Sequence, residues 1–223
     1  MPNFTLLALE QTRESFTKKE PLFRWKVYHV KELFMAFLPK MEINNSSKIQ
    51  LNFGIKGDEY EVNSVLGVTN TFVEGFDFEA FNELDIREQE FLILNIIVDK
   101  LCEISQRNGV NIEKINIIKE TSSKVVEVNF DLTLHIKRLS KRSPNREYTV
   151  NVYRCLNSSC GESWRCDIKN NKSGEVVQKW MTKIPDYIYM NDFFKRVEIT
   201  NTEYVIYNSF SEIEFQTSLE NAD

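Results

Sequence analysis

The chain has 223 residues, with 28 basic and 33 acidic side chains and a formal net charge of −5. Hydrophobic residues make up 42% and aromatic residues 12%, enough for a sizeable core. The 7 glycines and 5 prolines are too few for collagen-like, low-complexity or largely disordered chains. We expect a single α+β domain over residues 1–223, with a division into two lobes near 110–122 as the alternative.

The first ten residues lack the features of a secretory signal, since they contain no basic residue and already include Glu10. The longest strongly apolar stretch, from Phe91 to Val98, is far shorter than the roughly 18 residues that span a bilayer. Four cysteines are too few for a disulfide-dense secreted scaffold. We therefore expect a cytoplasmic protein with free thiols, no membrane contact and no cofactor.

In the first third, residues 4–10 fit a strand. Apolar residues at spacings of three or four predict a helix over about 29–38 that ends before Pro39, whereas residues 22–28 fit a helix or a strand. Alternation over 49–55 and again over 60–66, across Gly57 and Asp58, predicts a β-hairpin with one buried face.

The clearest helix runs over 86–107. Asp85 and Glu88 have the spacing of a capping box, and Asn108 with Gly109 supplies a left-handed stop. Its apolar stripe is broad, so we expect this helix to lie across a sheet as its main packing partner.

The second half predicts a series of strands. Apolar residues alternate strictly from Val126 to Ile136, and further strands are expected over 148–156, 164–169 and 176–181, then near Val197 and over 204–207. The expected fold is an antiparallel β-meander packed against the long helix, with a further N-terminal helix. The polar face of the first of these strands is either a solvated sheet face or a binding face. Its residues are Glu127, Asn129, Asp131, Thr133, His135 and Lys137.

Most catalytic signatures are absent from the sequence. The glycines form no dinucleotide-binding or P-loop spacing, no G-x-S-x-G motif occurs, and there are only two histidines. Cys155, Cys160 and Cys166 are spaced C-x4-C-x5-C, which misses the close pairs typical of structural zinc sites. We expect no metal.

One triplet supports an enzymatic alternative. Asp167-Ile168-Lys169 has the D-x-K form of the metal-dependent PD-(D/E)xK nucleases, in which a carboxylate binds Mg²⁺ and a lysine faces the scissile phosphate. Asp131 or Glu127 would supply the second carboxylate. Strand alternation alone also places the two charged residues of such a triplet on one solvated face.

Charge is strongly segregated along the chain. Residues 58–90 hold ten acids and one base, Arg87, and they also hold Phe72, Phe76, Phe78 and Phe81. Residues 137–146 hold five bases and no acid, which fits an exposed loop or a weak phosphate-binding segment. These bases are Lys137, Arg138, Lys141, Arg142 and Arg146.

The charge pattern favours a non-enzymatic protein-binding domain, in its most concrete form an immunity- or antitoxin-like inhibitor that neutralises a basic partner protein. Carboxylates would steer the encounter, and phenylalanine rings would anchor it. The expected partner-binding residues are Glu74, Phe76, Asp77, Phe78, Glu79, Phe81 and Glu83. We do not expect nucleic acid as a partner, because the chain is acidic overall and no aromatic residue interleaves with the basic segment.

A third alternative is a structural or oligomerising subunit. Its interface would use a short aromatic segment near residue 190. The residues concerned are Tyr187, Tyr189, Phe193 and Phe194.

Overall fold

A computed structural model of the chain describes residues 3–12, 23–55, 62–107, 109, 111–182 and 193–220. The chain forms two compact units. Unit 1 comprises Met1–Asp131 with Asn157–Gly161, and unit 2 comprises Leu132–Leu156 with Glu162–Asp223. Helices and antiparallel sheets are both present, which confirms the α+β class.

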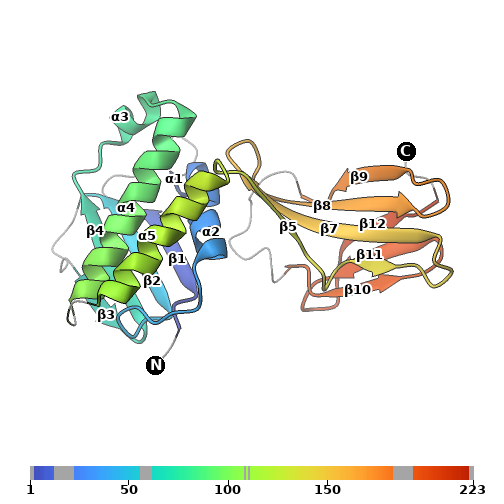
Figure 1. The fold of residues 1–223 in the computed structure, drawn as a ribbon, viewed down its shortest axis with the longest axis horizontal. Coiled ribbons are helices and arrows are strands. Elements are labelled where there is room, and N and C mark those ends of the chain that lie inside the picture. The colour runs from blue at the N-terminus through green and yellow to red at the C-terminus, as the bar shows by residue number, and fades with distance from the viewer. Residues whose placement is uncertain are drawn as a thin grey trace. The chain divides into compact units, whose positions relative to one another are not determined.

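Unit 1 contains a four-stranded sheet in the order β1-β2-β4-β3 (Figure 1). Its strands are β1 (Leu6–Gln11), β2 (Lys48–Gly54), β3 (Val62–Val65) and β4 (Val68–Glu74). The pairs β1–β2 and β2–β4 are parallel, and β3–β4 is antiparallel.

The hairpin predicted over 49–66 is therefore wrong, because β2 pairs with β1 and β4 whereas β3 pairs with β4. A parallel pair needs a long crossover between its strands. Among the described residues between β1 and β2, the chain forms two helices, α1 (Phe23–Lys26) and α2 (Tyr28–Phe37). Residues 22–28 fitted either a helix or a strand, and the helix is confirmed for α1.

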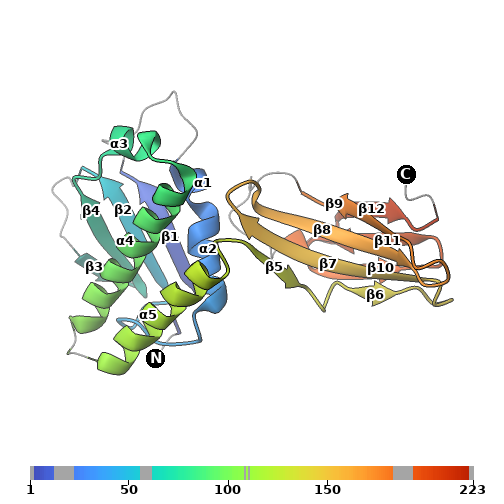
Figure 2. The same cartoon turned by 45° about the horizontal axis from the view of Figure 1, so that its top comes forward.

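Three further helices complete unit 1: α3 (Phe78–Glu83), α4 (Ile86–Gln106) and α5 (Ile112–Glu127). The Asp85 side chain accepts from the Glu88 amide while the Glu88 carboxylate accepts from the Asp85 amide, which confirms the predicted capping box. Helix α4 packs against α5 and α2, and Figures 1 and 2 show α4 and α5 over the sheet. The long helix therefore covers the mixed sheet of unit 1, and not the antiparallel meander that the sequence suggested.

The strand predicted over 126–136 is wrong for its first half, whereas residues 132–135 do form a strand. Helix α5 runs through Glu127, with Asn111 as its N-cap and with Ile118, Thr121 and Val125 buried at helical spacing. Asn129 and Phe130 then adopt left-handed φ angles of 54° and 55°, which end the helix. Of the predicted polar strand face, only Thr133 and His135 lie in a strand, β5 (Leu132–His135).

Unit 2 consists of two antiparallel sheets. The first has the order β5-β7-β8-β9, with β6 also paired to β7, and the second has the order β10-β11-β12. Besides β5, the strands of these sheets are β6 (Lys141–Arg142), β7 (Tyr148–Asn157), β8 (Gly161–Asn170), β9 (Val176–Trp180), β10 (Arg196–Ile199), β11 (Glu203–Tyr207) and β12 (Ile213–Ser218). The sequence predicted most of them correctly, and the two that it did not predict are β6 and β12.

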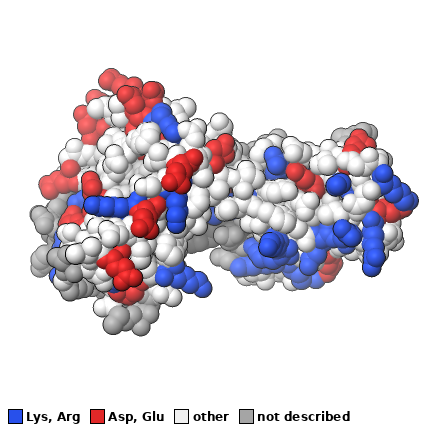
Figure 3. Space-filling model, in the orientation of Figure 1, with Lys and Arg blue, Asp and Glu red and all other residues white. Residues whose placement is uncertain are grey.

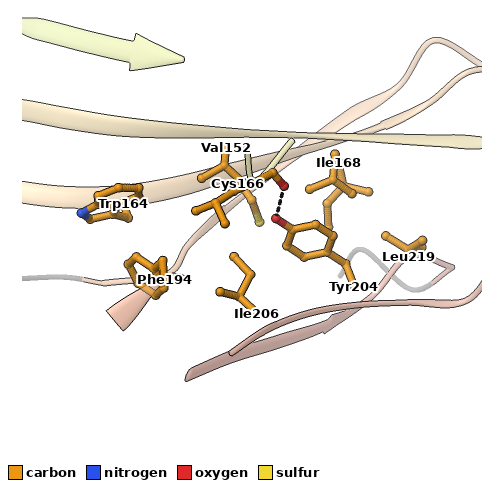
Figure 4. Packing of buried hydrophobic residues seen from close by; sticks show 10 residues of the cluster. Val152, Trp164, Cys166, Ile168, Phe194, Tyr204, Ile206 and Leu219 are labelled. Carbon is orange, nitrogen blue, oxygen red and sulfur yellow. Dashed lines mark hydrogen bonds between the residues drawn. The ribbon is translucent and has the colours of Figure 1, made fainter. Parts of the chain in front are cut away.

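Residues of both sheets of unit 2 meet in one core, in which Trp164, Cys166, Tyr204 and Ile206 are fully buried (Figure 4). The Tyr204 hydroxyl donates to the Leu139 carbonyl oxygen at 2.6 Å. Phe194 is also part of this core, with 3% of its surface exposed, and Phe193 packs against it. Phe194 is therefore not the exposed interface residue expected for an oligomerising subunit, whereas Tyr187 and Tyr189 lie outside the described residues.

A buried ion pair lies at the end of β7 and the start of β8. The Arg154 guanidinium donates from Nε and from a terminal nitrogen to the two oxygens of Glu162, at 2.7 and 2.8 Å. The Trp164 indole donates to the same carboxylate at 2.9 Å. With both charges paired, this polar group is tolerated in the interior.

Replacement of Tyr204 by phenylalanine tests the buried hydroxyl. We expect Tyr204→Phe to lower the free energy of unfolding by about 1–3 kcal/mol, because the Leu139 carbonyl would stay buried without its donor. Urea unfolding followed by tryptophan fluorescence measures the change. Tyr207→Phe is the matched control, since its hydroxyl bonds Glu198 at the exposed surface, and an equal loss in both variants would contradict the expectation.

The stability of unit 2 is expected to fall as the pH becomes alkaline. Burial raises the pKa of the Cys166 thiol from 9.0 to about 12, and burial also raises the pKa of Tyr204. The folded state holds the Cys166 thiol proton more tightly than the unfolded chain does. The resulting stabilisation of the fold is complete below pH 9 and is lost as the pH rises towards 12. Urea unfolding at several pH values measures the free energy of unfolding. Between pH 9 and 12 this free energy should fall less steeply in Cys166→Ala than in wild type, by about 1.4 kcal/mol per pH unit. Parallel curves would contradict this.

Candidate functional sites

The acidic segment of unit 1 forms a corner built from the end of β4, helix α3 and the first turn of α4. Six of its carboxylates are exposed, and Figure 3 shows acidic side chains gathered over this corner. They belong to Glu74, Asp77, Glu79, Glu83, Asp85 and Glu88. The acidic segment also includes the acids at positions 58, 59 and 61, which lie outside the described residues.

The phenylalanines of the same segment are not exposed anchors, which corrects the sequence-based interpretation. Phe76, Phe78 and Phe81 pack with Phe23 and Phe53, with ring centroids 4.8–5.6 Å apart. Phe81 is 2% exposed, and Phe76 and Phe78 are half-buried. The rings hold α3 against the sheet of unit 1 and leave the carboxylates outside.

Arg87, the one basic residue of the acidic segment, points away from the exposed carboxylates. Arg87 forms an ion pair with the buried Glu90 at 3.1 Å and donates to Asn129. Its guanidinium also lies over the rings of Phe91 and Phe130, at 5.0 and 4.6 Å from their centroids. The exposed carboxylates therefore keep their charge without compensation from Arg87.

A pocket of about 260 Å³ borders the acidic corner. Its wall includes Ile86, Gln89 and Glu90 of α4, and Lys26 and His29 from the first helices. His29 Nε2 lies 2.9 Å from a Glu90 oxygen, and both residues are about 95% buried. No sequence pattern predicts this His–Glu pair, because residues 61 positions apart come into contact only when α2 packs on α4.

The residues of the nuclease alternative are divided between the units. Asp131 belongs to unit 1, whereas Asp167 and Lys169 lie on β8 in unit 2. Asp167 lies 3.0 Å from Arg165 Nε, at an angle that makes the contact electrostatic and not a hydrogen bond. Across the described ranges, no three His, Cys, Asp or Glu side chains gather with metal-binding geometry.

The basic segment 137–146 lies in unit 2, and all five of its basic side chains are exposed. Lys141 and Arg142 form β6, at the edge of the first sheet. Arg138 donates to the Phe194 carbonyl, so this base also links the segment to the residues that precede β10. The structure brings the other bases to the surface without assigning them a ligand.

No disulfide joins any of the four cysteines. Cys155 and Cys166 are buried, whereas Cys102 and Cys160 are half-buried. Burial raises the pKa of both Cys102 and Cys166 above 9.0, which disfavours the thiolate that metals and alkylating reagents need.

No match was found among protein-family models, curated proteins or solved structures. Among the described helices, none is both long enough and apolar enough to cross a bilayer.

Thiol labelling tests the placement of the cysteines. In the folded protein at pH 8 we expect iodoacetamide to modify Cys160 faster than Cys155 or Cys166, because the latter two are buried. Peptide mass spectrometry measures each rate, and labelling in denaturant is the control in which the buried pair should catch up. Rapid modification of Cys166 in the folded state would contradict the structure.

Proposed function

We propose that the protein binds a basic partner protein in the cytoplasm through the acidic corner of unit 1, as an immunity- or antitoxin-like inhibitor would. The observation that carries the proposal is the set of six exposed carboxylates over α3 and the start of α4. Charges of one sign on a surface raise the association rate of an oppositely charged partner and disfavour partners of like charge.

The corner is preorganised for this role. Asp77 accepts from the Glu79 and Ala80 amides at 3.0 Å, and the capping box fixes the start of α4. The phenylalanine cluster holds α3 from beneath. A partner that docks there would order few backbone residues, so less of the interaction free energy would be lost.

Ile86, in the wall of the pocket beside the corner, is the apolar anchor that we propose in place of the phenylalanines. Ile86 lies between Asp85 and Arg87, is 61% exposed, and forms part of the pocket wall. An apolar side chain of the partner could bury against Ile86 while its basic neighbours meet the carboxylates. Interfaces of this type combine a desolvated centre with a charged rim.

The proposed cytoplasmic location is supported by the thiols. No disulfide joins any of the four cysteines, and both Cys155 and Cys166 lie within unit 2. Free thiols are typical of reducing compartments.

A charge-matched pair of variants tests the proposal. The first is Glu74→Gln with Glu79→Gln and Glu83→Gln, which removes three charges from the corner and spares the capping residues. The second is Glu113→Gln with Glu120→Gln and Glu127→Gln, which removes three exposed charges from α5. Tagged proteins are used to capture partners from native lysate, and the captured protein is then purified and titrated directly.

We expect wild type and the α5 variant to capture a basic protein from the lysate, and the corner variant to lose it. With purified components at low salt, affinity should fall by at least about tenfold in the corner variant alone, and wild-type binding should weaken as salt rises. Equal affinity of the two triple variants would refute a role for the corner.

A further inference from the structure

Four flat side chains form one transverse row on the outer face of the first sheet of unit 2. His135 on β5 is paired with Tyr153 on β7, and Arg165 on β8 is paired with Trp180 on β9. The His135 and Tyr153 rings are 5.4 Å apart, and the Arg165 guanidinium lies 5.5 Å from the Tyr153 ring and 5.9 Å from the Trp180 ring. The row thus crosses four neighbouring strands without a break.

The row faces away from the core. Side chains alternate along a strand, and the buried Val152, Trp164 and Cys166 occupy the opposite face of β7 and β8. Trp180 is 51% exposed, His135 is exposed, and Tyr153 and Arg165 are half-buried. An exposed tryptophan at the end of an aromatic row is a surface that a planar ligand can cover.

Polar contacts hold two members of the row, His135 and Arg165, in place. His135 Nε2 lies 2.9 Å from the Ser140 hydroxyl, and Arg165 lies 3.0 Å from Asp167. Since these side chains are already fixed, a ligand that stacks on them would lose little affinity to their ordering.

The charge of this face complements an anion. Asp167 is the one acid among the outward-facing described strand residues, and it is paired with Arg165. Arg142 and Lys169 are exposed on the same face, each about 13 Å along the strands from the row at 3.3 Å per residue. The basic segment continues this charge at the β5–β6 edge.

The acidic net charge of the whole chain does not describe unit 2. Unit 1 contains 15 bases and 21 acids, whereas unit 2 contains 13 bases and 12 acids. The excess of acids that disfavours nucleic acid therefore belongs to unit 1. Aromatic residues are absent from the basic segment, but the neighbouring strands supply them.

We propose that this face of unit 2 binds single-stranded nucleic acid, with bases stacked on Tyr153, Arg165 and Trp180 and phosphates near Arg142 and Lys169. Bases stack on aromatic rings and guanidinium planes, and lysines and arginines contact the backbone in a salt-dependent manner. This inference is independent of the acidic corner and of any partner protein.

Fluorescence anisotropy with fluorescein-labelled oligo(dT) and oligo(U) of 12 nucleotides tests the proposal on the full chain. We expect wild type to bind at 50 mM salt and to weaken as salt rises. Trp180→Ala should reduce affinity about tenfold or more, whereas Trp180→Phe should retain most of it because a ring remains. The comparison of the two probes shows whether DNA or RNA is preferred.

Two variants of unit 2 serve as controls. Phe210→Ala removes a ring that is 83% exposed between β11 and β12, and Arg196→Gln removes a base from the second sheet. Both should bind like wild type, while Lys169→Gln with Arg142→Gln should weaken binding and flatten its salt dependence. The corner variant of unit 1 should bind both probes normally, which separates this test from that of the proposed function.

Three results would overturn the assignment. The first is no anisotropy change with either probe at 100 µM protein in 50 mM salt. The second is oligonucleotide binding that Trp180→Ala leaves unchanged. The third is salt-independent binding of a neutral hexasaccharide that Trp180→Ala abolishes, because aromatic rows also stack on sugars and the charged residues would then play no part.

Discussion

The packing of five phenylalanines in unit 1 governs what the acidic segment presents to solvent. Phe23 contacts all four of the other rings, and these come from β2, from the turn after β4 and from α3. Edge-to-face contacts add to the free energy of burying the rings, so the cluster fixes a short helix that could not be stable alone. The carboxylates of α3 stay outside because the rings occupy the inner side.

Charge is organised by unit and not by the chain as a whole. The acids of unit 1 lie over one corner, while Arg87 turns inward to Glu90. Unit 2 has nearly balanced charge, with its basic segment and aromatic row on the same sheet. A net charge averaged over 223 residues hides both features, since electrostatic attraction depends on charges within about a Debye length of the ligand.

Paired polar groups in the interior of unit 2 restrict how its strands can pack. Glu162 receives hydrogen bonds from both Arg154 and Trp164, and Tyr204 bonds a carbonyl that would otherwise be buried alone. A shifted register would leave a charge or a carbonyl without its partner, at a cost of several kcal/mol for the charge. The aromatic row on the outer face depends on the same register, because its four residues meet only when β5, β7, β8 and β9 align.

Elements whose local signals agree with one another could be predicted from the sequence. Asp85 and Glu88 define the start of α4, and alternation defines β7 and β8, because capping and strand periodicity act over a few residues. The remaining features depend on packing between segments that are distant in the chain. Residues 126–136 alternate like a strand, yet burial of Ile118 and Val125 extends α5 to Glu127. The parallel pairing of β2, the His29–Glu90 contact and the row from His135 to Trp180 all join residues distant in the chain, so no local pattern encodes them.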